Sequence, residues 1–334
     1  MSSQILVEAP GVHRVADHTP RDPGPGEALV AVHAVGICGS DREVYQGNRP
    51  EGYVRYPLTP GHEWSGTVTA VGPGVPGSLT GRKVVGEGFR NCQVCERCHA
   101  GETTLCTAGY EETGFTRPGA MAATLTLPAR LLHVLPDEAD LTAAALLEPA
   151  ACVAAAALKA GARPGERVAV VGTGTLGMFA VQFLRAVSPA ELLVVGTRRD
   201  REALARRFGA TDFRLKDEEA PAGYDVVIET AGSASAARTA AALLRRGGRL
   251  VLTGIPAPGA DGLDPTDLVV RQLEVHTVFG APPDAWAHTV RVFGAGLLEP
   301  LPLVTHELPL TGFSEAIELV GAGDPAVGKV LLRP

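Results

Sequence analysis

Two patterns of hydrophobic and polar residues divide this chain. Up to about residue 150, short runs that alternate between apolar and polar residues, such as 28–35 and 66–71, are separated by glycines and prolines. Such alternation is typical of strands with one buried face. The first part of the chain is therefore predicted to be a β-rich lobe.

From residue 167 onward, short apolar runs alternate with amphipathic stretches. The predicted strands are 168–171, 192–195, 226–228, 250–253 and 273–279, and the predicted helices are 176–187, 200–208 and 236–244. This alternation predicts a parallel sheet covered by helices on both faces. A helix at 286–293 then leads into a tail that lacks a core of its own, and we expect this tail to return to the first lobe.

The composition fits two globular domains and a small-molecule substrate. A chain of 334 residues is longer than one hydrophobic core usually grows. The net charge of −7, without a basic stripe, argues against nucleic acid and against an anionic membrane as partners. Residues 1–11 do not resemble a secretory signal, and the apolar stretch 143–158 is too short to span a membrane, so a cytoplasmic location is expected.

Four of the six cysteines lie in one short segment. Their spacing is Cys-x2-Cys-x2-Cys-x7-Cys, and they are Cys92, Cys95, Cys98 and Cys106. Four thiolates on tight turns suit one tetrahedral zinc ion and leave no coordination position open, so we predict a structural zinc site in a lobe at about 88–108. Cys152 has alanines around it and is interpreted as a small buried apolar residue.

A glycine-rich turn follows the strand predicted at 168–171. It has the form G-x-G-x-x-G and comprises Gly172, Gly174, Thr175, Leu176 and Gly177 with Thr173. Between a strand and a helix, this motif predicts a dinucleotide site with the pyrophosphate at the helix N-terminus.

The residues after the second strand of this region favour NADP over NAD. Where an acidic residue would bind the ribose 2′-hydroxyl, the chain has Gly196, Thr197, Arg198 and Arg199. Arginine binds a 2′-phosphate well, and a carboxylate would repel it. The alternative is that both arginines only lie at the solvated start of a helix.

Cys38, His62 and Glu63 supply the three ligand types of an open zinc site. The chain resembles the zinc-dependent medium-chain alcohol and polyol dehydrogenases over nearly its whole length. The resemblance rests on four elements in chain order: Cys38-Gly39-Ser40-Asp41, Gly61-His62-Glu63 with Gly66, the four-cysteine lobe and the turn at Gly172. The resemblance implies an α/β fold class. It consists of a GroES-like β-rich catalytic domain, residues 1–151 and 282–334, and a doubly wound parallel-sheet (Rossmann) NADP-binding domain, residues 152–281.

The same resemblance implies two zinc ions per chain and assigns roles to individual residues. Cys38 and His62 would bind the catalytic zinc, with Glu63 as a ligand or an exchanging neighbour and Glu148 as a direct or water-mediated ligand. Asp41 would orient the histidine, and Ser40 would carry the alcohol proton. Many relatives have a histidine where this chain has Glu43, which leaves the outer proton route open. Thr230, Gly254 and Phe279 are expected near the nicotinamide.

The substrate is expected to be a secondary alcohol on a sugar, polyol or cyclitol. Asp41-Arg42-Glu43 resembles glucose dehydrogenases, and residues 56–57 and 60–66 resemble the deoxy-inosamine (cyclitol) dehydrogenases. Polar residues near the expected pocket fit this substrate class, although they could equally form a solvated loop: Glu43, Tyr45, Gln46, Asn48 and Arg49.

Two other functions stay open at this stage. One is a threonine-type amino-alcohol dehydrogenase. The other is a non-catalytic NADPH-binding sensor that retains only the structural zinc. In each case the resemblance suggests a homodimer or homotetramer.

Overall fold

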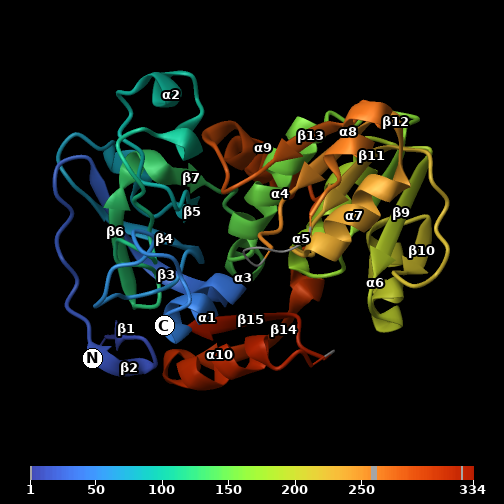
Figure 1. Ribbon diagram of the computed structural model, residues 1–334. Helices are drawn as coiled ribbons and strands as arrows, with labels where there is room; N and C mark the ends of the chain where they lie inside the picture. The colour runs from blue at the N-terminus through green and yellow to red at the C-terminus, as the bar shows by residue number, and fades with distance from the viewer. Residues whose placement is uncertain (1, 257–261, 325) are drawn as a thin grey trace. The chain divides into compact units, whose positions relative to one another are not determined.

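The chain forms two compact units in the computed structural model, which describes residues 2–256, 262–324 and 326–334 (Figure 1). Unit 1 comprises Met1–Glu148 and Pro282–Pro334, and unit 2 comprises Pro149–Ala281. Among the described residues, no helix has the length and apolar character needed to cross a membrane.

Unit 2 is a six-stranded, fully parallel sheet flanked by helices. Its strand order is β10-β9-β8-β11-β12-β13. The strands are β8 (Arg167–Val171), β9 (Glu191–Gly196), β10 (Asp212–Leu215), β11 (Tyr224–Glu229), β12 (Leu244–Leu252) and β13 (Glu274–Thr277). The helices include α5 (Thr175–Arg185), α6 (Glu202–Phe208), α7 (Ala234–Leu243) and α8 (Pro265–Arg271). Because β9 and β11 lie on opposite sides of β8, the winding direction changes at β8, and in such sheets ligands bind at this switch point.

The predicted strands of unit 2 are confirmed, but β12 begins at Leu244, well before the start predicted at 250. The apolar runs of the central strands are buried because helices cover the sheet, and Val168, Ala169 and Val170 have no exposed surface, whereas Val275 on the edge strand β13 is exposed. Strand β10 was not predicted, since only Phe213 of its four residues is buried and an edge strand this short carries little pattern.

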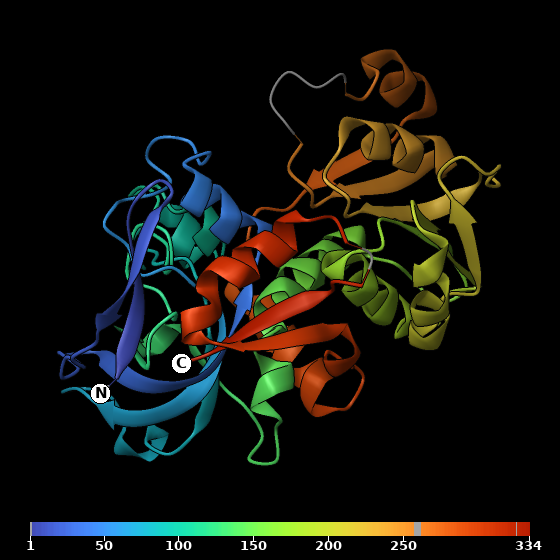
Figure 2. The same ribbon diagram turned by 90° about the horizontal axis from the view of Figure 1, so that it is seen from below.

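Unit 1 is built on a seven-stranded sheet with the order β14-β15-β3-β4-β5-β7, and β6 also pairs with β3. The strands are β3 (Glu27–Ile37), β4 (Glu63–Val71), β5 (Lys83–Gly86), β6 (Thr124–Pro128), β7 (Leu132–Val134), β14 (Val304–Pro309) and β15 (Lys329–Arg333). A separate hairpin is formed by β1 (Ser3–Ala9) and β2 (Val12–Asp17). The C-terminal tail, drawn in red in Figure 2, returns to the sheet of unit 1. Strand β15 pairs antiparallel with β3 and aligns Val330 with Ile37.

Short helices connect and flank the strands of unit 1. They are α1 (Gly39–Gln46), α2 (Glu96–His99), α3 (Leu141–Ala144), α9 (Pro283–Gly294) and α10 (Phe313–Gly321), and α4 (Leu147–Ala160) begins at the end of the unit. The polar residues at 43–46 therefore belong to a helix and not to a loop. Cys38 is its N-cap, Asp41 accepts a hydrogen bond from the Cys38 amide, and Gly47 ends the helix in the left-handed conformation.

Candidate functional site

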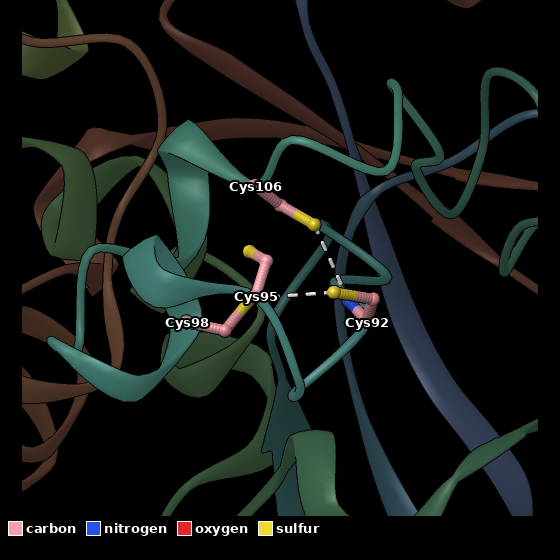
Figure 3. Close-up of side chains that lie close together, drawn as sticks. All are labelled: Cys92, Cys95, Cys98 and Cys106. Atoms are coloured by element: carbon pink, nitrogen blue, oxygen red, sulfur yellow. Dashed lines mark hydrogen bonds between the residues drawn. The ribbon is translucent and has the colours of Figure 1, made fainter.

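The four cysteines of the lobe converge on one point (Figure 3). Their sulfur atoms all lie within 4.8 Å of one another, and all four are free thiols. The Cys92 and Cys98 sulfurs are 3.9 Å apart. A tetrahedral zinc ion with bonds of about 2.3 Å requires sulfurs roughly 3.8 Å apart, so this cage fits zinc and its geometry excludes a disulfide between these two.

Electrostatics in the cage also favour a cation. Hydrogen bonds from the backbone of Thr107 and Cys98 lower the pKa of Cys95 to about 5, whereas burial raises the pKa of Cys98 to about 12. Four adjacent sulfurs cannot all be ionised unless a positive charge lies among them. The donor set therefore suits a metal that takes four thiolates.

A second cluster forms where β3 ends and β4 begins. These strands are antiparallel neighbours that align Gly36 with Glu63. Cys38 follows the end of β3 and His62 precedes the start of β4, so the pairing brings together residues far apart in sequence. One ligand atom from each of Cys38, His62 and Glu63 lies within 4.8 Å of the others. The cluster offers three ligands, and so it can leave a coordination position for another molecule.

Asp41 and Ser40 contact the two ring nitrogens of His62. Asp41 Oδ1 is 3.6 Å from His62 Nδ1, and neither atom has a hydrogen-bond partner among the described residues. Ser40 Oγ lies 3.4 Å from Nε2. Burial opposes charge on His62, but Asp41 and then Cys38 raise its pKa well above the usual value. A metal at Nε2 would replace that proton and leave Nδ1–H directed at Asp41, which fits a zinc-binding histidine.

Lys329 completes the cluster and was missed in the sequence. Its ammonium donates to Glu63 Oε2 at 2.5 Å and to the Ile37 carbonyl at 3.2 Å. Both side chains are almost fully buried. Burial would lower the pKa of Lys329, but Glu63 and then Cys38 raise it. The lysine comes from β15, and only the pairing of β15 with β3 brings it to this site.

Glu148 and Glu43 have different surroundings. Glu148 lies in the first turn of α4, partly buried, and is not one of the three residues that form the cluster. Glu43 is about half exposed and lies 3.6 Å from Arg49. The predicted roles of both residues stay predictions.

Arg49 belongs to a polar group beside the cluster. Its guanidinium carbon lies 3.9 Å from the centre of the Phe115 ring, and that ring lies 4.7 Å from the ring of His62. Arg49 donates to the Tyr110 hydroxyl, and Tyr110 in turn donates to the buried Glu112. Sequence reasoning missed Tyr110, Glu112 and Phe115, because no motif marks them.

The other polar side chains named with Arg49 have local partners. Tyr45 donates to the Gly11 carbonyl and packs edge-on against Phe313. Asn48 donates to Gln46. Of the five residues proposed to face substrate, Arg49 therefore has the most direct link to His62.

The glycine-rich turn follows β8 and opens α5. Gly172 has a φ of +121°, and a Cβ there would lie 2.4 Å from the Thr230 hydroxyl. A Cβ on Gly177 would lie 2.0 Å from the Gly172 carbonyl oxygen, so the helix can approach the turn only with glycine here. A Cβ on Gly174 would meet nothing within 4 Å, which leaves space at the N-terminus of α5 for a pyrophosphate.

Two arginines follow the end of β9, and they differ in how closely they are paired with acidic side chains. Arg199 is paired with Glu202 and Glu218. Arg198 is 3.7 Å from Asp200, a weaker contact. Thr197 lies between Gly196, the last residue of β9, and Arg198.

The residues expected near the nicotinamide lie at the carboxyl ends of other strands. Thr230 follows β11 and donates to the Val171 carbonyl. Gly254 follows β12 and Phe279 follows β13. The buried Glu229 was not predicted to have a role at this site. Its carboxylate accepts hydrogen bonds from the backbone amides of Ala231 and Gly232 and so shapes the loop after β11.

Comparison with known proteins agrees with this geometry. Residues 24–137 match the alcohol dehydrogenase GroES-like domain, and residues 175–294 match the zinc-binding dehydrogenase family. The chain is 30% identical to an L-threonine 3-dehydrogenase of Coxiella burnetii over 98% of this chain and 97% of that protein.

Many solved structures resemble the whole chain, and they include the following two. One, from Sinorhizobium meliloti, is assigned as a zinc-binding dehydrogenase and is bound to NADP, with a TM-score of 0.92, 27% identity and coverage of 100% and 99% of the two chains. The other is galactitol-1-phosphate dehydrogenase from Escherichia coli, with a TM-score of 0.90, 25% identity and coverage of 99% and 100%. The GroES-like domain, the parallel dinucleotide-binding sheet and the similarity to these relatives show that the chain belongs to the zinc-dependent medium-chain alcohol dehydrogenase family.

Proposed function

We propose that this chain is an NADP(H)-dependent dehydrogenase that interconverts a secondary alcohol and a ketone on a sugar, polyol or cyclitol, with one catalytic and one structural zinc per chain. The observation that carries the proposal is the Cys38–His62–Glu63 cluster with Arg49 and Glu112 packed behind Phe115. A charged, hydrogen-bonded group one aromatic ring away from His62 suits a substrate with several hydroxyl groups better than an aliphatic alcohol.

Several residues of the chain have roles in this chemistry. When bound, zinc would act as a Lewis acid on the hydroxyl oxygen and NADP⁺ would accept the hydride. Asp41 holds the His62 ring in orientation from the Nδ1 side. The Ser40 hydroxyl, beside Nε2, can accept the alcohol proton and pass it outward, since it both accepts and donates hydrogen bonds. Lys329 holds Glu63 in the cluster.

NADP(H) is favoured by the residues after β9. A Cβ on Gly196 would lie 2.5 Å from a Thr173 methyl, so an acidic side chain has no room at this position. Arg198 is the arginine with the weaker internal pairing, and it is therefore the better candidate for the 2′-phosphate. The NADP bound to the Sinorhizobium meliloti protein is consistent with this choice.

The strongest competitor is an amino-alcohol substrate, because the Coxiella burnetii relative is a threonine dehydrogenase. A panel of sugars, cyclitols and amino alcohols, each with NADP⁺ and NAD⁺, distinguishes the two. Turnover of L-threonine alone would reject the polyol assignment. Arg198→Gln should raise the KM for NADP⁺ but not for NAD⁺, with Arg199→Gln as the matched control.

A non-catalytic sensor makes a different prediction about metal. It requires one zinc per chain and no hydride transfer with any carbonyl. Elemental analysis of the active protein should instead give two. Cys38→Ser should keep the fold and lose both the catalytic zinc and turnover, and unchanged turnover would reject the proposed site.

The proposal extends to a homo-oligomer. The unit 2 sheet ends on β13, where Val275 is 37% exposed, and Val269 and Val270 on α8 are also exposed. An unpaired strand edge with apolar neighbours can pair with a second copy. Sedimentation of the chain at several concentrations tests this.

A further inference from the structure

Unit 1 contains a polar pocket of about 400 Å³ apart from both zinc clusters. It lies between the segment after β2 and residues 117–126, and its lining includes Arg21, Arg90, Arg117, Thr59 and Thr124. No candidate zinc ligand is among the described residues that line it. Three guanidinium groups and one carboxylate, that of Glu27, line this pocket, so its charge balance favours a negatively charged ligand.

Two of the three arginines already have carboxylate partners. Arg21 Nη2 lies 2.7 Å from Glu27 Oε2. Arg117 Nη2 lies 2.6 Å from Glu111 Oε1. Glu27 and Glu111, the two carboxylates close to Arg90, are thus each paired with another arginine.

Arg90 itself has no ion-pair partner among the described residues. Its Nε donates to Thr113 Oγ1 at 3.1 Å, but neither terminal nitrogen has a hydrogen-bond partner within the described chain, and Nη2 is inaccessible to solvent. Burial, followed by the charge of Arg117, lowers the pKa of Arg90 to about 10, so the side chain is still charged at neutral pH. In the part of the chain that the structure describes, Arg90 therefore has no counter-ion of its own and only shares the charge of Glu27 and Glu111, which a bound anion would supplement.

We propose that this pocket binds a phosphate-type oxyanion, as free phosphate or as the phosphate group of a monoester, with Arg90 as its principal contact. The Nη1 end of the Arg90 guanidinium can donate to one phosphate oxygen, and the Thr124 hydroxyl, which lies 2.7 Å from His18 Nε2, can donate to another when that nitrogen carries its proton. The inference does not depend on which alcohol the enzyme oxidises.

Calorimetric titration of the zinc-loaded full chain with inorganic phosphate, at constant ionic strength, tests this. An Arg198→Gln background removes competition from the proposed nucleotide phosphate site. We expect saturable binding of one phosphate per chain, and Arg90→Gln should weaken it about tenfold or more. Arg14→Gln, which removes the same charge from a surface pair with Glu8, should leave it unchanged.

A parallel titration with glycerol phosphate separates the two sources of the anion. Binding of phosphate alone supports a free-anion site, and comparable binding of glycerol phosphate supports a monoester site. Should Arg90→Gln lose its cooperative thermal transition, Thr124→Val provides a second variant, expected to weaken binding by a smaller factor.

Three results would overturn the proposal. The first is that phosphate shows no saturable binding, and the second is that the parent and Arg90→Gln bind phosphate with equal affinity. The third is that the parent binds no phosphate and Arg90→Gln changes the sedimenting mass of the chain. The last result would mean that the counter-ion of Arg90 is a carboxylate on a second copy of the chain.

Discussion

Replacing Lys329 by methionine should destabilise unit 1 strongly. The substitution keeps an unbranched side chain that is one atom shorter, and it removes the charge that lies 2.5 Å from Glu63. Glu63 is 1% exposed, so water cannot replace the lost ammonium. A buried carboxylate would be left without its partner.

Removing one partner of a buried ion pair costs about 3–5 kcal/mol. In a unit of this size each kcal/mol corresponds to about 2–4 °C, so the melting temperature should fall by roughly 6–20 °C. Lys83→Met is the matched control. Among the described residues its ammonium donates to the Ala139 carbonyl alone, and the loss of this one neutral acceptor should cost about 1 kcal/mol.

Urea unfolding followed by tryptophan fluorescence measures this effect directly. Both tryptophans, Trp64 and Trp286, belong to unit 1, and Trp64 is adjacent to Glu63. Each variant must be compared at the same measured zinc content, because a bound cation would partly compensate the lone carboxylate.

The double variant Glu63→Gln with Lys329→Met measures the interaction between the two charges apart from the other contacts of each side chain. Because it removes both charges, it should recover most of the stability lost in Lys329→Met. The reasoning fails if Lys329→Met costs no more than Lys83→Met, or if the two single effects simply add.

Other expected outcomes concern the nucleotide turn, the cysteine lobe and the acid stability of unit 2. Gly177→Ala should lower the melting temperature because its Cβ has no room, whereas Gly174→Ala should keep it and raise only the KM for NADP⁺; equal melting temperatures would contradict this. Cys98→Ser should lower the zinc content by one ion per chain, and unchanged zinc would exclude the cage. A hydrogen bond from Arg167 lowers the pKa of Glu191 below 4.5, so the stability it contributes is present above pH 4.5 and lost as the pH falls through the lower folded value. Glu191→Gln should flatten this slope in acid unfolding, and an unaltered slope would assign it to other groups.

Local patterns in the sequence were enough to predict the fold class and many of the residues of the candidate site. The cysteine cage could be found in the sequence because its four ligands lie in one loop, where spacing alone restricts the geometry. The parallel sheet was equally visible, since strands buried on both faces form continuous apolar runs. Short edge elements such as β10 carried too little burial to leave a pattern.

The surroundings of His62 depended on contacts between distant segments. Lys329 and Glu63 are 266 positions apart and meet only because β15 pairs with β3. Arg49 approaches His62 only across the ring of Phe115. Spacing along the chain constrains neighbours within a turn or a strand, whereas the register of a sheet and the packing of side chains determine which remote groups share a site. The residues that could hold a metal ion were therefore recognisable from residue order, while the charged groups around them were not.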